Sequence, residues 1–200
     1  MNEIGLVARF RPVHLAHAAL LEALCERAGP DGRVLVGVGS SNRYGARNPF
    51  TSGEAGVMID AVLRGAHRNY ALLGVPDLGD GPRWRDMVRE LMGPLDLFVT
   101  ANPYVRELMR EVYAVAHPRD LVPRARHVPV SGDLVRRAMS RGGDDWRGLV
   151  PCEVATVLEE LGLVERFRRE FGLSTLAMEA TGAPVTTPTA AEEERHVLLG

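Results

Sequence analysis

The chain has 200 residues, of which 46% are hydrophobic, so it can bury one proper core and we expect one catalytic domain. Its formal net charge of −2 argues against a general nucleic-acid binder, because such proteins usually carry a strong excess of basic residues. The N-terminus has no basic leader, no apolar run could cross a bilayer, and the two cysteines are far apart; we therefore expect a cytoplasmic protein without membrane or nucleic-acid partners.

Short apolar runs alternate with longer helical patterns along the first half of the chain. The runs at residues 4–8, 34–38, 71–73 and 95–100 predict strands. Strands that alternate with helices are typical of a parallel sheet. The sequence therefore predicts an α/β fold with a Rossmann-like parallel sheet flanked by helices. Ligands of such folds bind at the carboxyl edge of the strands.

Two helices in this half are delimited by capping and turn residues. Apolar residues at helical spacing predict a helix over residues 15–28, and the Gly-Pro-Asp-Gly run at 29–32 ends it. Thr51 and Glu54 have the spacing of a capping box. They predict a second helix that runs through about Leu63.

The second half of the chain is predicted to be mostly helical. A proline opens a helix over residues 103–111, and Ser131 is expected to cap a helix over 131–140. Apolar residues three and four apart at 151–161 and 164–171 predict a small helical pair that packs on the sheet domain.

The composition changes near the end of the chain. From about Ser174 the sequence is rich in Thr, Ala and Glu with little to bury, so we expect a mobile tail. The predicted organisation has three parts: an α/β domain at residues 1–150, a C-terminal helical subdomain at 151–173, and a disordered tail at 174–200.

The segment between the first predicted strand and helix concentrates groups that bind phosphate. It contains Arg9 at the end of the strand, and His14 and His17 at the start of the helix. The free N–H groups and the dipole of a helix N-terminus attract anions, and a spacing of three residues puts both imidazoles on one face. We therefore expect these groups to converge on a polyphosphate. Two alternatives remain open: a zinc-binding histidine pair, or surface histidines without a function.

The same segment resembles the signature of a known superfamily. Residues 8–17 read Ala-Arg-Phe-Arg-Pro-Val-His-Leu-Ala-His. They are similar to the Gly-Arg-Phe-Gln-Pro-x-His-x-Gly-His signature of nucleotidyltransferases, in the form carried by archaeal-type nicotinamide-nucleotide adenylyltransferases. Further motifs in the family's order and spacing extend the resemblance over roughly residues 4–171. They are Gly39-Ser40, Arg47 to Glu54, Val75-Pro76-Asp77 with Trp84, Thr100 to Pro103, Ser131-Gly132 with Arg136-Arg137, Gly142 to Trp146, and Leu149 to Pro151.

The resemblance implies a mechanism. In that family a phosphate oxygen of the acceptor attacks the α-phosphorus of ATP in line, and magnesium pyrophosphate leaves without a covalent enzyme intermediate. Such catalysis rests on holding two anions in attack geometry and on stabilising the charge that develops. By position, Arg9, His14 and His17 would hold the triphosphate and Arg136 would reach its leaving end. Mg²⁺ would arrive with the nucleoside triphosphate, and the second substrate would be a small phosphorylated acceptor.

Five more residues are implied to bind nucleotide or acceptor, and each has a simpler alternative. Arg47 falls where a family arginine approaches the phosphates, or it is an ordinary loop arginine. Ser131 and Gly132 would begin a helix whose N-terminus faces the phosphates, and Ser131 would cap that helix in either case. Trp84 would lie against the nicotinamide ring, or it is a buried structural tryptophan. Asn102 would bind nucleotide, or it only caps the helix that follows.

Three positions depart from the family pattern. Ala16 replaces a glycine near the phosphates and adds one methyl group. Asp133 replaces a threonine; its carboxylate would repel a triphosphate unless it acts through magnesium or its waters, although an acid in the first turn of a helix is stabilising by itself. Gly81 stands where the family has an asparagine that reads the carboxamide of nicotinamide. Arg83 and Arg85 flank Trp84, so an acceptor with more negative charge is conceivable.

These observations predict a nucleotidyltransferase of NAD biosynthesis that converts ATP and nicotinamide mononucleotide into NAD and pyrophosphate. One alternative keeps the chemistry and changes the substrates: a nucleotidyltransferase of specialised metabolism, for example a cytidylyltransferase, acting on another phosphorylated or phosphonate acceptor. Another, motivated by Asp133 and Ala16, is a catalytically silent nucleotide-binding or regulatory protein. Relatives commonly assemble through this fold, so we expect a homo-oligomer.

Overall fold

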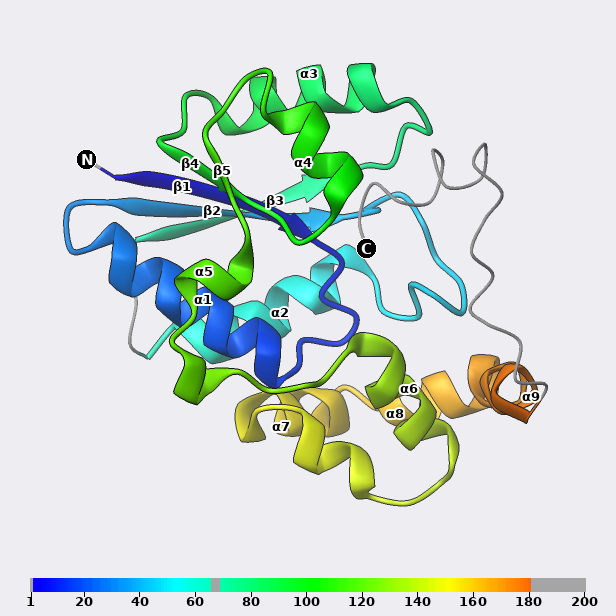
Figure 1. Cartoon of the computed structure of the whole chain (residues 1–200). Helices are drawn as coiled ribbons and strands as arrows, with labels where there is room; N and C mark the ends of the chain where they lie inside the picture. The colour runs from blue at the N-terminus through cyan, green and yellow to red at the C-terminus, as the bar shows by residue number, and fades with distance from the viewer. Residues whose placement is uncertain (1, 66–68, 181–200) are drawn as a thin grey trace.

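The described part of the chain, residues 2–65 and 69–180 of a computed structural model, folds around one parallel sheet (Figure 1). The five strands of this sheet lie in the order β3-β2-β1-β4-β5. They are β1 (Glu3–Ala8), β2 (Arg33–Gly39), β3 (Tyr70–Val75), β4 (Leu97–Val99) and β5 (Val115–Ala116). The order runs from β1 through β2 to β3 on one side and continues with β4 on the other, so the sheet has a switch point between β1 and β4.

Helices cover both faces of the sheet, and most of the C-terminal third of the described chain is helical (Figure 1). The α-helices are α1 (Leu15–Ala28), α2 (Ser52–Leu63), α3 (Gly81–Met92), α4 (Pro103–Met109), α5 (Pro118–Leu121), α6 (Gly132–Ser140), α7 (Cys152–Glu160), α8 (Leu163–Phe167) and α9 (Leu173–Ala180). The short helices η1 (Arg124–Arg126) and η2 (Asp145–Leu149) are 3-10 turns, and η3 (Arg168–Gly172) is a π-turn between α8 and α9. Within the described residues, no helix is long and apolar enough to cross a membrane.

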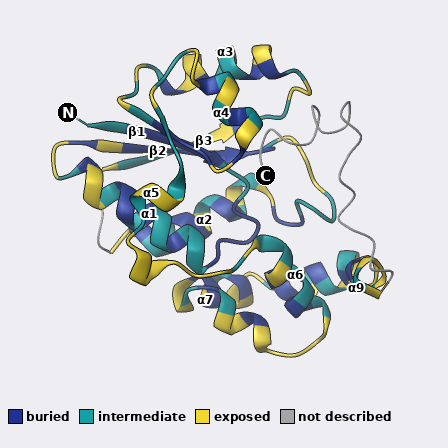
Figure 2. Ribbon diagram, in the orientation of Figure 1, coloured by how far each residue is buried: buried dark blue, intermediate teal, exposed yellow. Residues whose placement is uncertain are grey.

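The sheet separates two hydrophobic cores (Figure 2). Residues of α3 and α4 pack on one face and form the smaller core. The larger core lies on the other face, where α1 and α2 pack on the sheet and α6 to α8 pack beneath them. For example, Phe50 and Met58 share this core with Leu158 and Phe167. The C-terminal helices are therefore packed on the sheet domain, as the sequence predicted.

The fold class predicted from the sequence is confirmed, and two helices agree with their predicted bounds. α1 ends at Ala28 and is capped by Gly29, whose φ of 75° lies in the region that glycine tolerates best. α2 begins with a complete capping box between Thr51 and Glu54. Helix α3 was not predicted, although Trp84 and Val88 on its buried face have helical spacing. The two-residue strand β5 and the one-turn helix α5 were also not predicted.

The C-terminal segment differs from the prediction in its extent. The helix predicted at 164–171 continues through the π-turn into α9, which ends at Ala180. The prediction of a disordered tail from Ser174 is therefore wrong for residues 174–180. Thr175 is buried and donates a hydrogen bond to the Phe171 carbonyl at 2.8 Å, which gives this helix a side chain to bury. The rest of the predicted tail, residues 181–200, lies outside the described residues.

Candidate active site

The turn that joins β1 to α1 lies at the carboxyl edge of the sheet and is buried. Phe10 has a φ of 54° and no exposed surface, a left-handed conformation that costs a non-glycine residue about 1–2 kcal/mol. His14 is the N-cap of α1, and its Nδ1 accepts a long 3.4 Å hydrogen bond from the backbone N–H of His17. The predicted helix start is confirmed, with His14 just before the helix and His17 in its first turn.

The two imidazoles stack on each other, with ring centroids 3.6 Å apart and an interplanar angle of 17°. Burial, and then the positive charge of Arg136, lowers the pKa of His14 to about 4. Burial, and then His14, holds the pKa of His17 well below its usual range. Both rings are therefore neutral at pH 7. The Nδ1 of His14 accepts from the His17 backbone, which leaves its Nε2–H for a phosphate oxygen, whereas the ring of His17 makes a hydrogen bond to the Pro12 carbonyl. In the described chain no three His, Cys, Asp or Glu side chains are grouped so that they could hold a metal ion.

Three arginines from separate segments converge on this turn: Arg9 after β1, Arg47 in the loop after β2, and Arg136 in α6. Burial, and then repulsion from Arg47, lowers the pKa of Arg9. Burial lowers the pKa of Arg136 to about 10; Asp133 opposes this shift, whereas Arg9 and Arg47 add to it. Cations that repel one another away from bulk water are stabilised when an anion with several charges binds among them. We call these three residues the arginine cluster.

Helix α6 brings Arg136 against the turn. Ser131 caps the helix, and its Oγ accepts a 3.2 Å hydrogen bond from the backbone N–H of Leu134. The Nη1 of Arg136 donates a 2.8 Å hydrogen bond to the carbonyl of Arg11. A methyl group on Gly132 would lie 3.1 Å from this Nη1, so glycine leaves room for the guanidinium over the first turn. The predicted role of Ser131 as a cap is confirmed.

Asp133 faces the arginines of its own helix. Its carboxylate lies 2.8 Å from Arg137 Nη2 and 3.6 Å from Arg136 Nη2. The side chain of Asp133 is 40% exposed, so water weakens both pairs. The negative charge that departs from the family pattern is thus partly balanced before any anion binds.

The loop that carries Arg47 is fastened to the turn by Arg11. This side chain is only 2% exposed, and its guanidinium donates 3.2 Å hydrogen bonds to the carbonyls of Ser40 and Arg43. Ser40 itself has a φ of 47°, so the start of the loop is held in a conformation that a serine rarely adopts. Two backbone hydrogen bonds between Gly45 and Asn48 then close the tight turn that contains Arg47.

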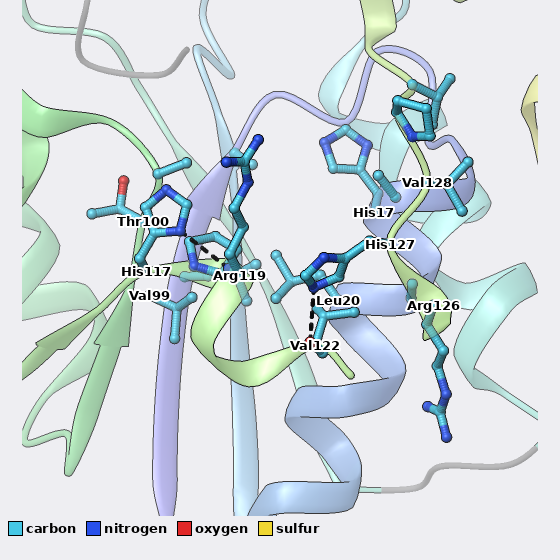
Figure 3. A pocket seen from close by; sticks show the side chains of 18 of the residues that line it. His17, Leu20, Val99, Thr100, His117, Arg119, Val122, Arg126, His127 and Val128 are labelled. Carbon is cyan, nitrogen blue, oxygen red and sulfur yellow. Dashed lines mark hydrogen bonds between the residues drawn. The ribbon is translucent and has the colours of Figure 1, made fainter. Parts of the chain in front are cut away.

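A pocket of about 550 Å³ opens beside His17 at the switch point between β1 and β4 (Figure 3). Its walls are mainly apolar and come from these strands, from α1 and from the segment after β5. His117, Arg119, Arg126 and His127 also line it. Pockets of this size and lining bind small molecules, and the switch point of a parallel sheet is a common place for nucleotides.

Comparison with known proteins gives sequence relatives and a fold neighbour. The chain is 34% identical to the nicotinamide-nucleotide adenylyltransferase of Methanothrix thermoacetophila, over 81% of the chain and 92% of that protein. It is 32% identical to the enzyme of that name from Picrophilus torridus, over 82% of the chain and 94% of that protein. The chain belongs to the nicotinamide-nucleotide adenylyltransferase family.

The fold neighbour is more remote. The Plasmodium falciparum nicotinic acid mononucleotide adenylyltransferase, in complex with NaAD, superposes with a TM-score of 0.53 at 9% identity, over 82% of the chain and 98% of that structure. This likeness supports the fold alone. No protein-family model matches the chain. Membership of the nicotinamide-nucleotide adenylyltransferase family confirms the predicted enzyme class, a nucleotidyltransferase.

Two predicted ligand-binding residues of this family member lie in structural positions. Trp84 has no exposed surface and belongs to the core between α3, α4 and the sheet, so its geometry favours the structural alternative. Asn102 is 8% exposed and caps α4, because its Oδ1 accepts hydrogen bonds from the backbone N–H groups of Tyr104 and Val105. Neither residue lines the pocket beside His17.

The space next to Gly81 is filled by another side chain. A Cβ at this position would lie 2.1 Å from Tyr104 Oη and 3.0 Å from Leu108 Cδ1. An asparagine, as the family pattern has it, would not fit here unless Tyr104 moved. The close approach of Tyr104 therefore requires glycine at position 81 in this member of the family.

Sequence reasoning missed Arg11 and the basic residues of the pocket. Arg11 stands where the family signature has glutamine, and this difference was the available signal. Its hydrogen bonds reach residues 29 and 32 positions away, which no local pattern reveals. His117 and Arg119 follow a strand too short to predict, so nothing in the sequence placed them at the sheet edge.

Proposed function

We propose that this protein transfers the adenylyl group of ATP to nicotinamide mononucleotide, which gives NAD and pyrophosphate. The single observation that carries the proposal is the convergence of the arginine cluster on two neutral, stacked histidines at the N-terminus of α1. Such a site matches the charge of a triphosphate. The curated relatives are named nicotinamide-nucleotide adenylyltransferase, which supports adenylyl transfer to nicotinamide mononucleotide as the reaction of this site.

The residues of the site divide the work by position. Arg9, His14 and His17 would bind triphosphate oxygens, and Arg47 and Arg136 would stabilise the negative charge that grows on the pyrophosphate as it leaves. The acceptor's phosphate oxygen forms the new bond to the α-phosphorus while the bond to the leaving oxygen breaks, so the chain needs to supply no nucleophile. Charge-assisted hydrogen bonds of this kind contribute roughly 1.5–3 kcal/mol each.

Magnesium would enter as part of the substrate, bound to the triphosphate. The carboxylate of Asp133 lies beside Arg136 and already forms ion pairs with Arg136 and Arg137. Mg²⁺ commonly takes most of its ligands from phosphates and water, with one or two carboxylates. One carboxylate at the rim of the site fits that pattern.

The pocket beside His17 would hold the nucleoside end of ATP. It adjoins the histidine proposed to bind phosphate, and its apolar walls suit a purine ring. Residues 126–130 form part of the lining, so they would lie beside the base. We expect the choice between ATP and other triphosphates to be made here.

The acceptor is the part of the proposal that this chain's own residues specify least. Gly81 favours a test of other acceptors, because this chain lacks the amide of the family pattern and Tyr104 occupies the space beside position 81. A specialised nucleotidyltransferase, for example one that uses CTP and a phosphonate, remains the second candidate for that reason.

A panel assay tests the proposal. The four common ribonucleoside triphosphates are each combined with nicotinamide mononucleotide, nicotinate mononucleotide and a phosphonate, and pyrophosphate release is followed. We expect ATP with nicotinamide mononucleotide to turn over fastest, with NAD identified as the product. Release of pyrophosphate from another pair, with no NAD from ATP and nicotinamide mononucleotide, would overturn the proposal, and release from CTP or with the phosphonate would establish the second candidate. Nucleotide binding without release from any pair would establish the catalytically silent alternative.

A further inference from the structure

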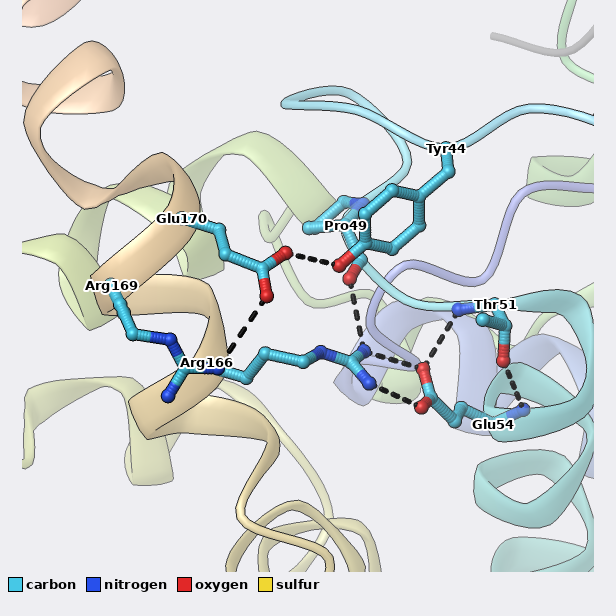
Figure 4. Close-up of polar contacts among 7 residues, drawn as sticks. All are labelled: Tyr44, Pro49, Thr51, Glu54, Arg166, Arg169 and Glu170. Carbon is cyan, nitrogen blue, oxygen red and sulfur yellow. Dashed lines mark hydrogen bonds and ion pairs between the residues drawn. The ribbon is translucent and has the colours of Figure 1, made fainter.

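The loop that carries Arg47 is also fastened to the C-terminal helices (Figure 4). Arg166 of α8 forms a two-point ion pair with Glu54, with Nη–Oε distances of 2.6 and 2.7 Å. The same guanidinium donates a 3.2 Å hydrogen bond to the carbonyl of Pro49, at the end of the loop. The hydroxyl of Tyr44, in the middle of the loop, donates to Glu170 of η3.

These contacts are largely shielded from solvent. The side chains of Arg166 and Glu54 are 24% and 19% exposed. Burial alone would raise the pKa of Glu54, but hydrogen bonds from Arg166 and from the backbone N–H of Thr51 outweigh it and lower that pKa. Glu54 therefore stays charged at neutral pH, and it joins the start of α2 to α8. The ring of Tyr44 lies edge-on to Phe171, with the Arg166 guanidinium 5.9 Å from its centroid.

Arg47 lies between two anchors on the same loop. Arg11 holds the first part through the carbonyls of Ser40 and Arg43, and Arg166 holds the last part through Pro49. The loop is otherwise a polar segment on the surface, with Arg43 and Tyr44 exposed. Since Arg47 must stay near two other cations, which repel it, its position needs support from outside the arginine cluster.

We propose that Arg166 is a positioning residue for Arg47. Through Glu54 and Pro49 it holds the loop so that Arg47 stays in the arginine cluster before an anion binds. The C-terminal helices thereby contribute to phosphate binding without touching the phosphates. This inference rests on the proposed role of the arginine cluster, and its test uses inorganic tripolyphosphate so that it does not depend on the acceptor or on turnover.

The test is a double-mutant cycle on the full chain. Tripolyphosphate affinity is measured by calorimetry for the wild type, Arg47→Ala, Arg166→Met and the double variant. We expect Arg47→Ala to weaken binding by about 10- to 100-fold and Arg166→Met by about 5- to 10-fold, because charge-assisted contacts are lost or misplaced. In the Arg47→Ala background the Arg166→Met effect should fall below about twofold, because the residue through which it acts is gone.

Arg168→Met is the matched control. Arg168 lies two positions after Arg166. Its guanidinium donates to the carbonyl of Met139, near the end of α6, and to that of Gly143, which follows α6, and neither contact involves Glu54. It should lower thermal stability as much as Arg166→Met does and leave tripolyphosphate affinity within about twofold.

The outcomes separate the two proposals. Equal effects of Arg166→Met with and without Arg47, or an equal loss of affinity in Arg168→Met, would overturn the positioning role and leave the proposed function intact. A wild type that does not bind tripolyphosphate would overturn the polyphosphate role of the arginine cluster itself.

Discussion

The low pKa of His14 makes the stability of the protein depend on pH in a defined direction. Burial, and then Arg136, lowers the pKa from 6.5 to about 4 in the folded chain. A group whose folded pKa is depressed favours folding above its unfolded pKa and loses that contribution as pH falls towards the folded value. The window for His14 therefore lies between pH 6.5 and about 4. Replacement of His14 by asparagine removes the titration and keeps an N-cap that can accept from the His17 backbone N–H.

The size of the effect follows from the two pKa values. At about pH 4.5 the unfolded imidazole is almost fully protonated, whereas only about a quarter of the folded molecules carry the proton. The wild type should therefore lose about 2–3 kcal/mol more stability than His14→Asn when the pH falls from about 7.5 to about 4.5. Urea unfolding at both pH values measures this difference. Equal losses for the two proteins would show that His14 is neither desolvated nor close to Arg136.

Other side chains give predictions of the same kind. Gly81→Ala should lower the melting temperature, although alanine normally favours a helix, because the added Cβ would meet the phenol oxygen of Tyr104 and Leu108 Cδ1. Tyr104→Phe in the same chain should restore part of the loss, because it removes the nearest of these atoms; an unchanged melting temperature for Gly81→Ala would contradict this. Asp133→Asn should strengthen the binding of magnesium-free tripolyphosphate by about three- to tenfold in calorimetry; weaker binding would mean that Asp133 holds Arg136 in place. Trp84→Phe should reduce the free energy of unfolding by about 1–3 kcal/mol and change the acceptor KM less than about threefold; a larger change in KM would restore the predicted contact with the acceptor.

The sequence predicted those parts of the fold in which neighbouring residues decide the structure. The bounds of α1 and α2 followed from Gly29 and from the Thr51 and Glu54 pair, which act within one turn of the helix end. Helix α3 has an equally local pattern around Trp84 and could have been predicted. Strand β5 could not, since its two residues form a strand only because β4 lies beside them.

The sequence predicted most of the residues of the candidate site but not how they are arranged in space. The resemblance supplied Arg9, Arg47 and Arg136, but their mutual repulsion and burial are long-range facts that only the fold provides. Arg11 was not predicted because its partners are loop carbonyls, which carry no sequence signal. The assignment of Trp84 to the acceptor came from the family pattern and is not favoured by its complete burial.

The extent of the C-terminal helices shows the limit of composition as a guide. The segment from Ser174 is rich in Thr, Ala and Glu and was therefore predicted to be a tail, yet Thr175 is buried and Glu179 forms an ion pair with Arg141 of the segment after α6. Contacts with residues far away in sequence decided the structure of this segment.

The most direct test of the account is NAD formation from ATP and nicotinamide mononucleotide by the wild type and His17→Ala, with the melting temperature of each recorded. We expect the wild type to form NAD. The variant should lose at least about 100-fold in turnover, because a hydrogen bond that strengthens as charge develops is lost, while its melting temperature changes by only a few degrees. Turnover that falls only in proportion to a lowered melting temperature would make His17 a structural residue. No NAD from the wild type would contradict the proposed reaction.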